Sequence, residues 1–320
     1  MPASNFAGIM LSGLKLSSVL ATAALLAGAG VSAKPMETPQ RILSPSSKWQ
    51  LDYAEDACRL GRMFGKADEQ VVFYIERYGA SDDLFMLVAG KPLGRSNNSK
   101  VRYLFGPSDS GEAREYDVEL GELGDIEPAL LFSTTTLLPL DDDDKNGDAK
   151  RTFDPASAAD MHKFGYRIAS EEEARIEWLD LDRGMRGGPV RLQLGSMGPP
   201  MAAMRKCSDE LLTHWGIDTA AHAKMTRPAL PASNPGYWLN ASDYPTDLLR
   251  KGAQGIVKFR LSVDATGKPT QCHIQKSTRP EGFDKVVCDR LLQRAEFEPA
   301  LGEDGQPIAS YWRSTVRFQL

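Results

Sequence analysis

The pattern of apolar and polar residues is most regular in the last quarter of the chain, between Tyr244 and Leu320. Apolar residues alternate from Gly255 to Asp264, which predicts a strand with one buried face. They recur at intervals of three and four from Glu281 to Ala295, which predicts an amphipathic helix. The predicted order is short helix, strand, strand, helix, strand, at Thr246 to Lys251, Gly255 to Asp264, Lys268 to Ser277, Glu281 to Ala295 and Ser310 to Leu320.

A different pattern fills residues 44–226, where short alternating runs are separated by Gly, Ser, Asp and Pro. The alternation from Val71 to Ile75 is typical of an antiparallel strand with one buried and one solvent-facing side. Two flanking helices are predicted, from Tyr53 to Phe64 and from Met201 to Trp215. Seven strands favour a sandwich or a strongly bent sheet, and they are predicted at Glu69 to Arg77, Leu84 to Ala89, Lys100 to Phe105, Glu115 to Leu120, Ala129 to Leu137, Ala174 to Asp182 and Val190 to Leu194.

These patterns predict an α+β protein with two folded regions. A β-rich, sandwich-like domain with flanking helices occupies residues 44–226, and a second domain occupies residues 244–320. The segment 227–243 contains three prolines between Pro228 and Gly236, which favours a linker.

The first 33 residues have the features of a cleavable signal peptide. An apolar run from Leu16 to Gly30 follows Lys15 and precedes Val31-Ser32-Ala33, a small-residue cleavage site. The run is shorter than the roughly 20 residues that span a bilayer. We expect cleavage after Ala33 and a soluble mature protein in an oxidising compartment. The alternative is an uncleaved anchor, in which Lys15 would lie inside the membrane.

Composition is ordinary for a soluble protein, with 42% hydrophobic residues, 25% charged residues and a net charge of −5 over 320 residues. This length suffices for two domains that each bury a core. Residues 244–320 hold 12 Lys and Arg against 9 Asp and Glu, so the remainder carries −8, an imbalance that chance also produces. The negative total argues against nucleic acid as a partner.

The four cysteines, which allow three disulfide connectivities, are Cys58, Cys207, Cys272 and Cys288. Pairing Cys58 with Cys207 and Cys272 with Cys288 keeps each bond inside one predicted domain. The second pair would join a predicted strand to the helix that packs over it. Behind a secretory leader, two disulfides are expected rather than four buried free thiols.

Several residues of the last region occur in a recognisable order: Tyr244-Pro245, Gly255, Val263-Asp264, Gly267, Ser277, Phe297 with Pro299, Gly305 and Phe318. Together they resemble a TonB C-terminal domain, the periplasmic end of an energy transducer that acts on outer-membrane receptors. The resemblance covers residues 244–320 only. It implies a three-stranded antiparallel sheet with helices.

In that family, the last strand and the Tyr-Pro entry meet a peptide of the receptor. The resemblance therefore implies partner-binding residues in this chain, namely Tyr244, Pro245, Tyr311, Trp312, Arg313 and Arg317. Core and rim packing is the alternative role for Tyr311 and Trp312. Outward-facing Arg313 and Arg317 would favour an acidic partner or protect a sheet edge from aggregation. The family's capacity for strand exchange makes a homodimer a further expectation.

One acidic stretch, Asp142-x-Asp144-x-Asn146-Gly147-Asp148, begins like a calcium-binding loop. Phe153 occupies the position at which such a loop carries its bidentate glutamate. We therefore predict a solvated loop, with at most a weak calcium site completed by Asp141 or Asp154.

Enzyme signatures are not found in the sequence. The stretch from Gly106 to Ser110 departs from the nucleophile-elbow pattern because its last position is not glycine. The four histidines lack the spacing of metal ligands. We predict no catalytic residue, no metal site and no cofactor, although carboxylates brought together by folding remain an open alternative.

Three functions agree with these observations. The first is a non-enzymatic periplasmic module that engages an outer-membrane receptor or another envelope protein by β-strand addition. The second is a membrane-anchored energy transducer with an uncleaved leader, in which residues 44–226 replace the usual Pro-rich spacer. The third is an envelope enzyme in the β-rich region that docks through its TonB-like domain.

Overall fold

The structure is a computed structural model that describes residues 36–107, 112–139, 168–184, 188–277 and 280–320. Every described residue belongs to one compact unit, residues 35–320. The signal peptide predicted at residues 1–33 and the acidic loop around Asp142, Asp144 and Asn146 lie outside the described residues. Within the described part of the chain, no helix is both long and apolar enough to cross a membrane.

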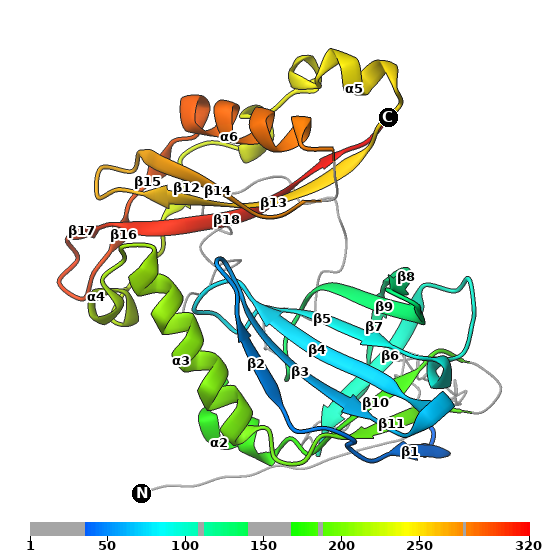
Figure 1. Cartoon of the computed structure of the whole chain (residues 1–320). Coiled ribbons are helices and arrows are strands. Elements are labelled where there is room, and N and C mark those ends of the chain that lie inside the picture. The colour runs from blue at the N-terminus through cyan, green and yellow to red at the C-terminus, as the bar shows by residue number, and fades with distance from the viewer. Residues whose placement is uncertain (1–35, 108–111, 140–167, 185–187, 278–279) are drawn as a thin grey trace, which may run out of the picture. The chain divides into compact units, whose positions relative to one another are not determined.

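Residues 41–135 contribute most strands of the β-rich region, which contains two sheets (Figure 1). The larger sheet has the order β2-β3-β4-β5-β9-β8, and all its neighbouring strands pair antiparallel. Its strands are β2 Gln50–Tyr53, β3 Cys58–Phe64, β4 Val71–Arg77, β5 Leu84–Ala89, β8 Glu119–Leu123 and β9 Ile126–Thr135.

The second sheet has the order β1-β11-β10-β6-β7, with a parallel β1–β11 pair and antiparallel pairs elsewhere. One buried cluster takes residues from both sheets, among them Phe73, Phe105 and Leu192. The alternation of β4 puts Phe73 and Ile75 into this cluster. The strands are β1 Arg41–Leu43, β6 Lys100–Gly106, β7 Arg114–Asp117, β10 Trp178–Asp182 and β11 Val190–Gln193.

The helix predicted from Tyr53 to Phe64 is wrong, because this segment forms β2, a turn and β3. The turn is closed by a hydrogen bond from the Ala54 N–H to the Ala57 carbonyl, 3.0 Å. From Cys58 to Phe64, β3 pairs in register with β4. Pairing with a strand further along the chain therefore overrides the local helical spacing of apolar residues.

Three further differences concern element boundaries. The strand predicted from Ala174 to Asp182 begins inside α2 Ser170–Arg175 and continues as β10, and the strand predicted from Glu115 to Leu120 is divided between β7 and β8. The helix predicted from Met201 to Trp215 is α3 Gly198–His214, which buries Met201, Met204 and Leu211. The short helix α4 Thr219–Ala223 follows it and is capped by the Asp218 carboxylate.

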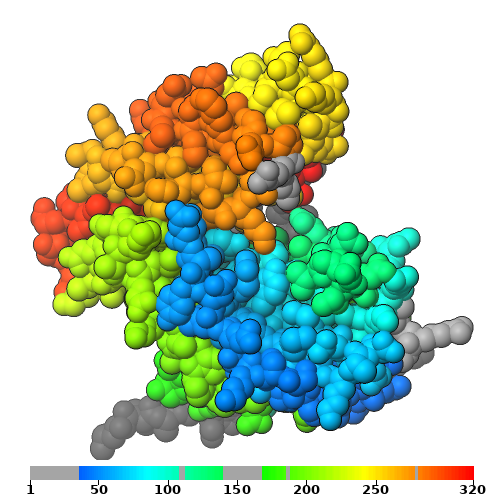
Figure 2. Space-filling view, viewed as in Figure 1, coloured from blue at the N-terminus to red at the C-terminus, as the bar shows by residue number. Residues whose placement is uncertain are grey.

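The last part of the chain forms a three-stranded antiparallel sheet in the order β14-β13-β18. The helix α6 Gly282–Arg294 covers one face and buries Phe283, Val287 and Leu291 against the strands (Figure 1). Figure 2 shows the surface that α5 Thr246–Arg250 and α6 present to solvent. The strands are β13 Gly255–Val263, β14 Pro269–Ser277 and β18 Ser310–Phe318, all close to the predicted bounds.

The segment 227–243 contacts the last region directly. Its strand β12 Leu230–Pro231 pairs with β15 Phe297–Glu298, and Trp238, 2% exposed, joins the same buried cluster as Phe259. Two turns of 3-10 helix, η3 Pro235–Tyr237 and η4 Ala241–Asp243, complete the segment. A two-stranded hairpin, β16 Ala300–Leu301 with β17 Pro307–Ile308, precedes β18.

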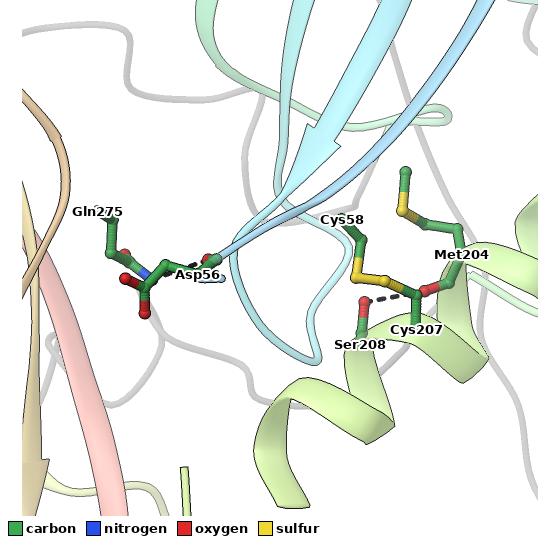
Figure 3. Close-up of a disulfide and its surroundings, with 6 residues drawn as sticks. All are labelled: Asp56, Cys58, Met204, Cys207, Ser208 and Gln275. Atoms are coloured by element: carbon green, nitrogen blue, oxygen red, sulfur yellow. Dashed lines mark hydrogen bonds between the residues drawn. A yellow bond between two sulfur atoms is a disulfide. The ribbon is translucent and has the colours of Figure 1, made fainter. Parts of the chain in front are cut away.

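Two disulfides fit the pairing expected from the sequence, Cys58–Cys207 and Cys272–Cys288. Cys58 starts β3 and Cys207 lies in the middle of α3, so this bond joins the larger sheet to its helix (Figure 3). Next to it, the Ser208 hydroxyl donates to the Met204 carbonyl, 3.0 Å. The other bond joins β14 to α6. Each disulfide therefore connects a helix to a strand that it packs against.

Candidate protein-binding surface

The strand β18 is one edge of the three-stranded sheet. It pairs with β13 over nine positions, from Gly255 opposite Phe318 to Val263 opposite Ser310. Within the described residues, β13 lies on one side of β18 in this sheet, and no strand of the sheet lies on the other side. An edge strand presents backbone N–H and C=O groups that an extended peptide can pair with.

One face of β18 belongs to the core under α6. Trp312, 4% exposed, lies against Trp238, Phe259 and Phe297, with ring centroids 5.2 to 5.7 Å apart within this group. Phe318 stacks on Phe283 at 4.1 Å. Trp312 is therefore a core residue of this region.

The Tyr-Pro entry packs against the same core. The Tyr244 ring meets Phe283 and Phe318 edge-on at 5.5 and 5.4 Å, and its hydroxyl donates to the Ala253 carbonyl. Pro245, which is partly exposed, is the N-cap residue of α5. Tyr244 thus fixes the entry of the chain next to the end of β18, while Pro245 remains partly accessible.

The opposite face of β18 carries Tyr311, Arg313, Thr315 and Arg317. Tyr311 is fully buried; its ring stacks on His222 at 5.4 Å and meets Trp215 edge-on at 5.4 Å. Burial raises the pKa of the Tyr311 phenol. Thr315 and Arg317, near the other end of the strand, are exposed.

The close approach of Tyr311 requires a glycine at position 79. Gly79 has φ +152°, and a Cβ there would lie 2.6 Å from the Tyr311 hydroxyl oxygen. Both the backbone conformation and the space therefore exclude a larger residue. The Tyr311 side chain therefore packs directly against the backbone of the turn after β4.

Comparison with known proteins agrees with this geometry. Residues 240–320 match the family described as Gram-negative bacterial TonB protein C-terminal. Residues 240–320 are a TonB C-terminal domain. The chain is also 37% identical over 92 residues to the protein named tonB2 of Pseudomonas aeruginosa, a match that covers 28% of this chain and 33% of that relative.

In the TonB C-terminal domain, the sheet face opposite α6 is rich in cations. Lys258 and Lys276 are directly paired across β13 and β14, and Arg260 is paired with Arg313 across β13 and β18. We call the five residues on this side the basic face: Lys258, Arg260, Lys276, Arg313 and Arg317. The prediction of binding residues missed the first three, although Lys258 and Arg260 alternate with the apolar residues of the predicted strand.

Four of these cations contact residues of the β-rich region. The Arg260 guanidinium, 1% exposed, lies 3.6 Å from the Asp56 carboxylate and 4.0 Å from the centre of the Trp215 ring. Arg313 donates to the Ser81 hydroxyl, 3.1 Å, and lies 3.8 Å from the Asp83 carboxylate. The remaining two, Lys258 and Lys276, lie 5.0 and 4.1 Å from the centre of the Phe85 ring.

The Glu76 carboxylate is a hydrogen-bond acceptor at the centre of this group of contacts. The carboxylate, 1% exposed, accepts from Arg59, 2.6 Å, from the Tyr78 hydroxyl, 2.8 Å, and from the Lys276 ammonium, 3.4 Å. Burial alone would raise the pKa of Glu76, but Lys276, Tyr78 and Arg59 outweigh it and hold the pKa below its usual value. Glu76 is therefore a buried anion surrounded by donors from both regions of the chain.

The burial of His222 predicts that the free energy of unfolding depends on pH. Burial lowers its pKa from 6.5 to about 4. Between these values the unfolded chain binds the proton and the folded chain does not, so stability falls as pH falls from 6.5 towards 4. We expect this residue to account for a loss of about 2 kcal/mol in unfolding free energy between pH 7 and pH 4.5.

The measurement is urea unfolding of the wild type and His222→Phe at both pH values. Phenylalanine keeps a ring against Tyr311 and does not titrate, so the variant should lose less stability on acidification. Equal losses in the two proteins would show that other groups determine the acid sensitivity.

Proposed function

We propose that this protein is a non-enzymatic periplasmic interaction module whose TonB C-terminal domain engages an outer-membrane receptor or another envelope protein by β-strand addition. The observation that carries the proposal is β18, an edge strand that is paired in its sheet with β13 and has exposed residues at Thr315 and Arg317. Main-chain hydrogen bonds along this edge would supply affinity, and side chains of β18 and the partly exposed Pro245 would supply selectivity.

The organisation that we propose for the chain has two domains. Residues 44–226 form a sandwich-like domain, residues 244–320 form the TonB C-terminal domain, and residues 227–243 connect them. Support comes from the separate buried clusters of the two regions, one centred on Phe73 and Phe105 and the other on Phe259 and Trp312.

Site-specific photo-crosslinking in cells tests the strand addition. A photoreactive amino acid is placed at Thr315 or Arg317 on β18, and at the exposed Thr270 on β14, the other edge of the sheet. We expect cross-links to one envelope protein from the two β18 positions and far fewer from position 270. Equal cross-linking from both edges, or none from β18, would contradict the proposal.

Cross-links between two copies of the chain at position 315 or 317 would instead identify β18 as a homodimer contact. Such exchange of the last strand is the homodimer that we propose as an alternative occupant of this edge. It would use the same backbone groups as a receptor peptide, so the two modes would exclude each other.

A membrane-anchored energy transducer is the second candidate, favoured by the likeness to the protein named tonB2. The two candidates differ in the fate of the leader. Mass analysis of the N-terminus after cell fractionation separates them. A start at Lys34 in the soluble periplasmic fraction supports the soluble module, and an intact leader in the inner membrane supports the transducer.

A further inference from the structure

Two charged surfaces of opposite sign meet where the β-rich region contacts the TonB C-terminal domain. The basic face supplies Lys258, Arg260, Lys276 and Arg313. The acidic side, which we call the acidic patch, consists of Asp56, Glu76 and Asp83. Asp56 forms an ion pair with Arg260, Glu76 with Lys276, and Asp83 with Arg313.

The apolar part of this junction includes a satellite cluster of Ala80, Leu212, Ile217 and Tyr311, separate from the main buried clusters of the two regions. The rings of Phe85 and Trp215 lie against cations of the basic face. The junction also has polar contacts, including a bond from the Gln275 amide to the Asp56 carbonyl, 3.4 Å (Figure 3). Polar junctions inside one chain resemble transient interfaces more than they resemble a core.

The net stabilisation from a charge pair at such a junction depends on how exposed the pair is. Each ion gives up hydration when the surfaces meet, and the attraction between the partners only partly offsets that loss. At the rim, Arg313 and Asp83 are 21% and 46% exposed, a setting in which solvent screens the pair and leaves it only weakly stabilising. A competing carboxylate that offers Arg313 the same contact would therefore displace Asp83 with little loss.

The contacts divide β18 into two halves. Tyr311 and Arg313 are held by residues 79–83, His222 and Trp215, whereas Thr315 and Arg317 remain exposed. A partner strand extending along β18 would meet Arg317 first and Arg313 next. The partner strand can reach the first half of β18 only when residues 79–83, His222 and Trp215 no longer contact it.

We propose that the contact between the acidic patch and the basic face is an autoinhibitory latch, closed in the free chain and opened by an acidic peptide that takes over Arg313 as it pairs with β18. The inference rests on the proposed function where it names β18 as the partner's strand. Because the peptide binds Arg313 better when the latch is open, its binding shifts the chain towards the open state. Conversely, anything that opens the latch increases the affinity for the peptide.

Amide hydrogen exchange of the full mature chain tests the latch without a partner. Asp83→Lys places a cation opposite Arg313 and leaves the TonB C-terminal domain unchanged. We expect exchange in residues 79–83 and 310–313 to become about fivefold faster together, the ratio that corresponds to about 1 kcal/mol. Exchange in β5 and α6 should stay at the wild-type rate.

Two further variants serve as controls. Asp68→Lys makes the same substitution at a remote residue, 95% exposed and paired at the surface with Lys91, so it should leave the exchange of both segments unchanged. Adding Arg313→Glu to Asp83→Lys restores an opposite-charge pair, so it should return exchange to the wild-type rate.

Wild-type protein provides a measurement that requires no substitution. Raising NaCl from about 0.05 to 1 M should accelerate exchange in residues 79–83 and 310–313, because salt screens partly exposed pairs. Unchanged exchange in Asp83→Lys and at high salt, or acceleration on one side of the junction only, would overturn the latch. That outcome would leave the photo-crosslinking of β18 unaffected, so failure of the latch and failure of the proposed function are distinguishable.

Discussion

Replacing Cys58 and Cys207 together by alanine is expected to lower the free energy of unfolding by about 4–5 kcal/mol. The bond closes a loop of 149 residues, and both cysteines are fully buried. In the chain-entropy account, a long loop restricts the unfolded chain strongly, and its release favours unfolding. The bond also holds α3 against β3, so its loss should loosen the helix that carries Leu212 and leads to His222. Urea unfolding under non-reducing conditions measures the change.

The matched control is the pair Cys272→Ala and Cys288→Ala. This bond closes a loop with a sequence separation of 16, for which the same account gives a smaller loss of about 3 kcal/mol. The main expectation is therefore that removing Cys58–Cys207 lowers the free energy of unfolding more than removing Cys272–Cys288 does. A larger loss from the short loop would show that local packing, rather than loop closure, determines the stabilisation.

Replacing Glu76 by lysine is expected to lower the free energy of unfolding by about 4 kcal/mol. The change removes the carboxylate that Arg59, Tyr78 and Lys276 share and places a third cation between Arg59 and Lys276. A buried cation without a partner is strongly unfavourable because it has lost its hydration. Thermal and urea unfolding at pH 7 measure the loss.

A matched control is available on the surface of the same region. Glu115 pairs with Lys100 at 2.8 Å, and both side chains are more than half exposed. Glu115→Lys makes the same chemical change in solvent and should cost less than about 1 kcal/mol. If the two substitutions had similar effects, the low exposure of Glu76 would be of no energetic consequence.

Local patterns predicted the C-terminal elements well. The apolar residues of β13 and α6 recur with the periods of a strand and a helix, and both elements form at nearly the predicted residues. Here local spacing and tertiary packing agree, because Val257, Phe259 and Leu261 all face the helix that supplies Phe283 and Val287. The prediction failed from Tyr53 to Phe64, where the pairing of β3 with both β2 and β4 outweighed the local helical spacing.

The arrangement of side chains along β18 was predictable in part. The alternation of β18 placed Tyr311, Arg313, Thr315 and Arg317 on one side, and the structure has them there. It did not distinguish the buried Tyr311 from the exposed Arg317, because residues on one face of a strand have the same period whatever covers them.

The sequence by itself determined which residues share a face, where the strands and helices of the last region lie, and which family that region resembles. Only the tertiary structure decided what covers each face. Glu76 and Arg260 both occupy positions that alternation assigns to solvent, yet each is 1% exposed. The physical reason is that the period of apolar residues reports which face of a strand points into its own core. The contact between two outward-facing polar surfaces depends instead on charge complementarity between residues about 200 positions apart, as in the pair of Glu76 with Lys276.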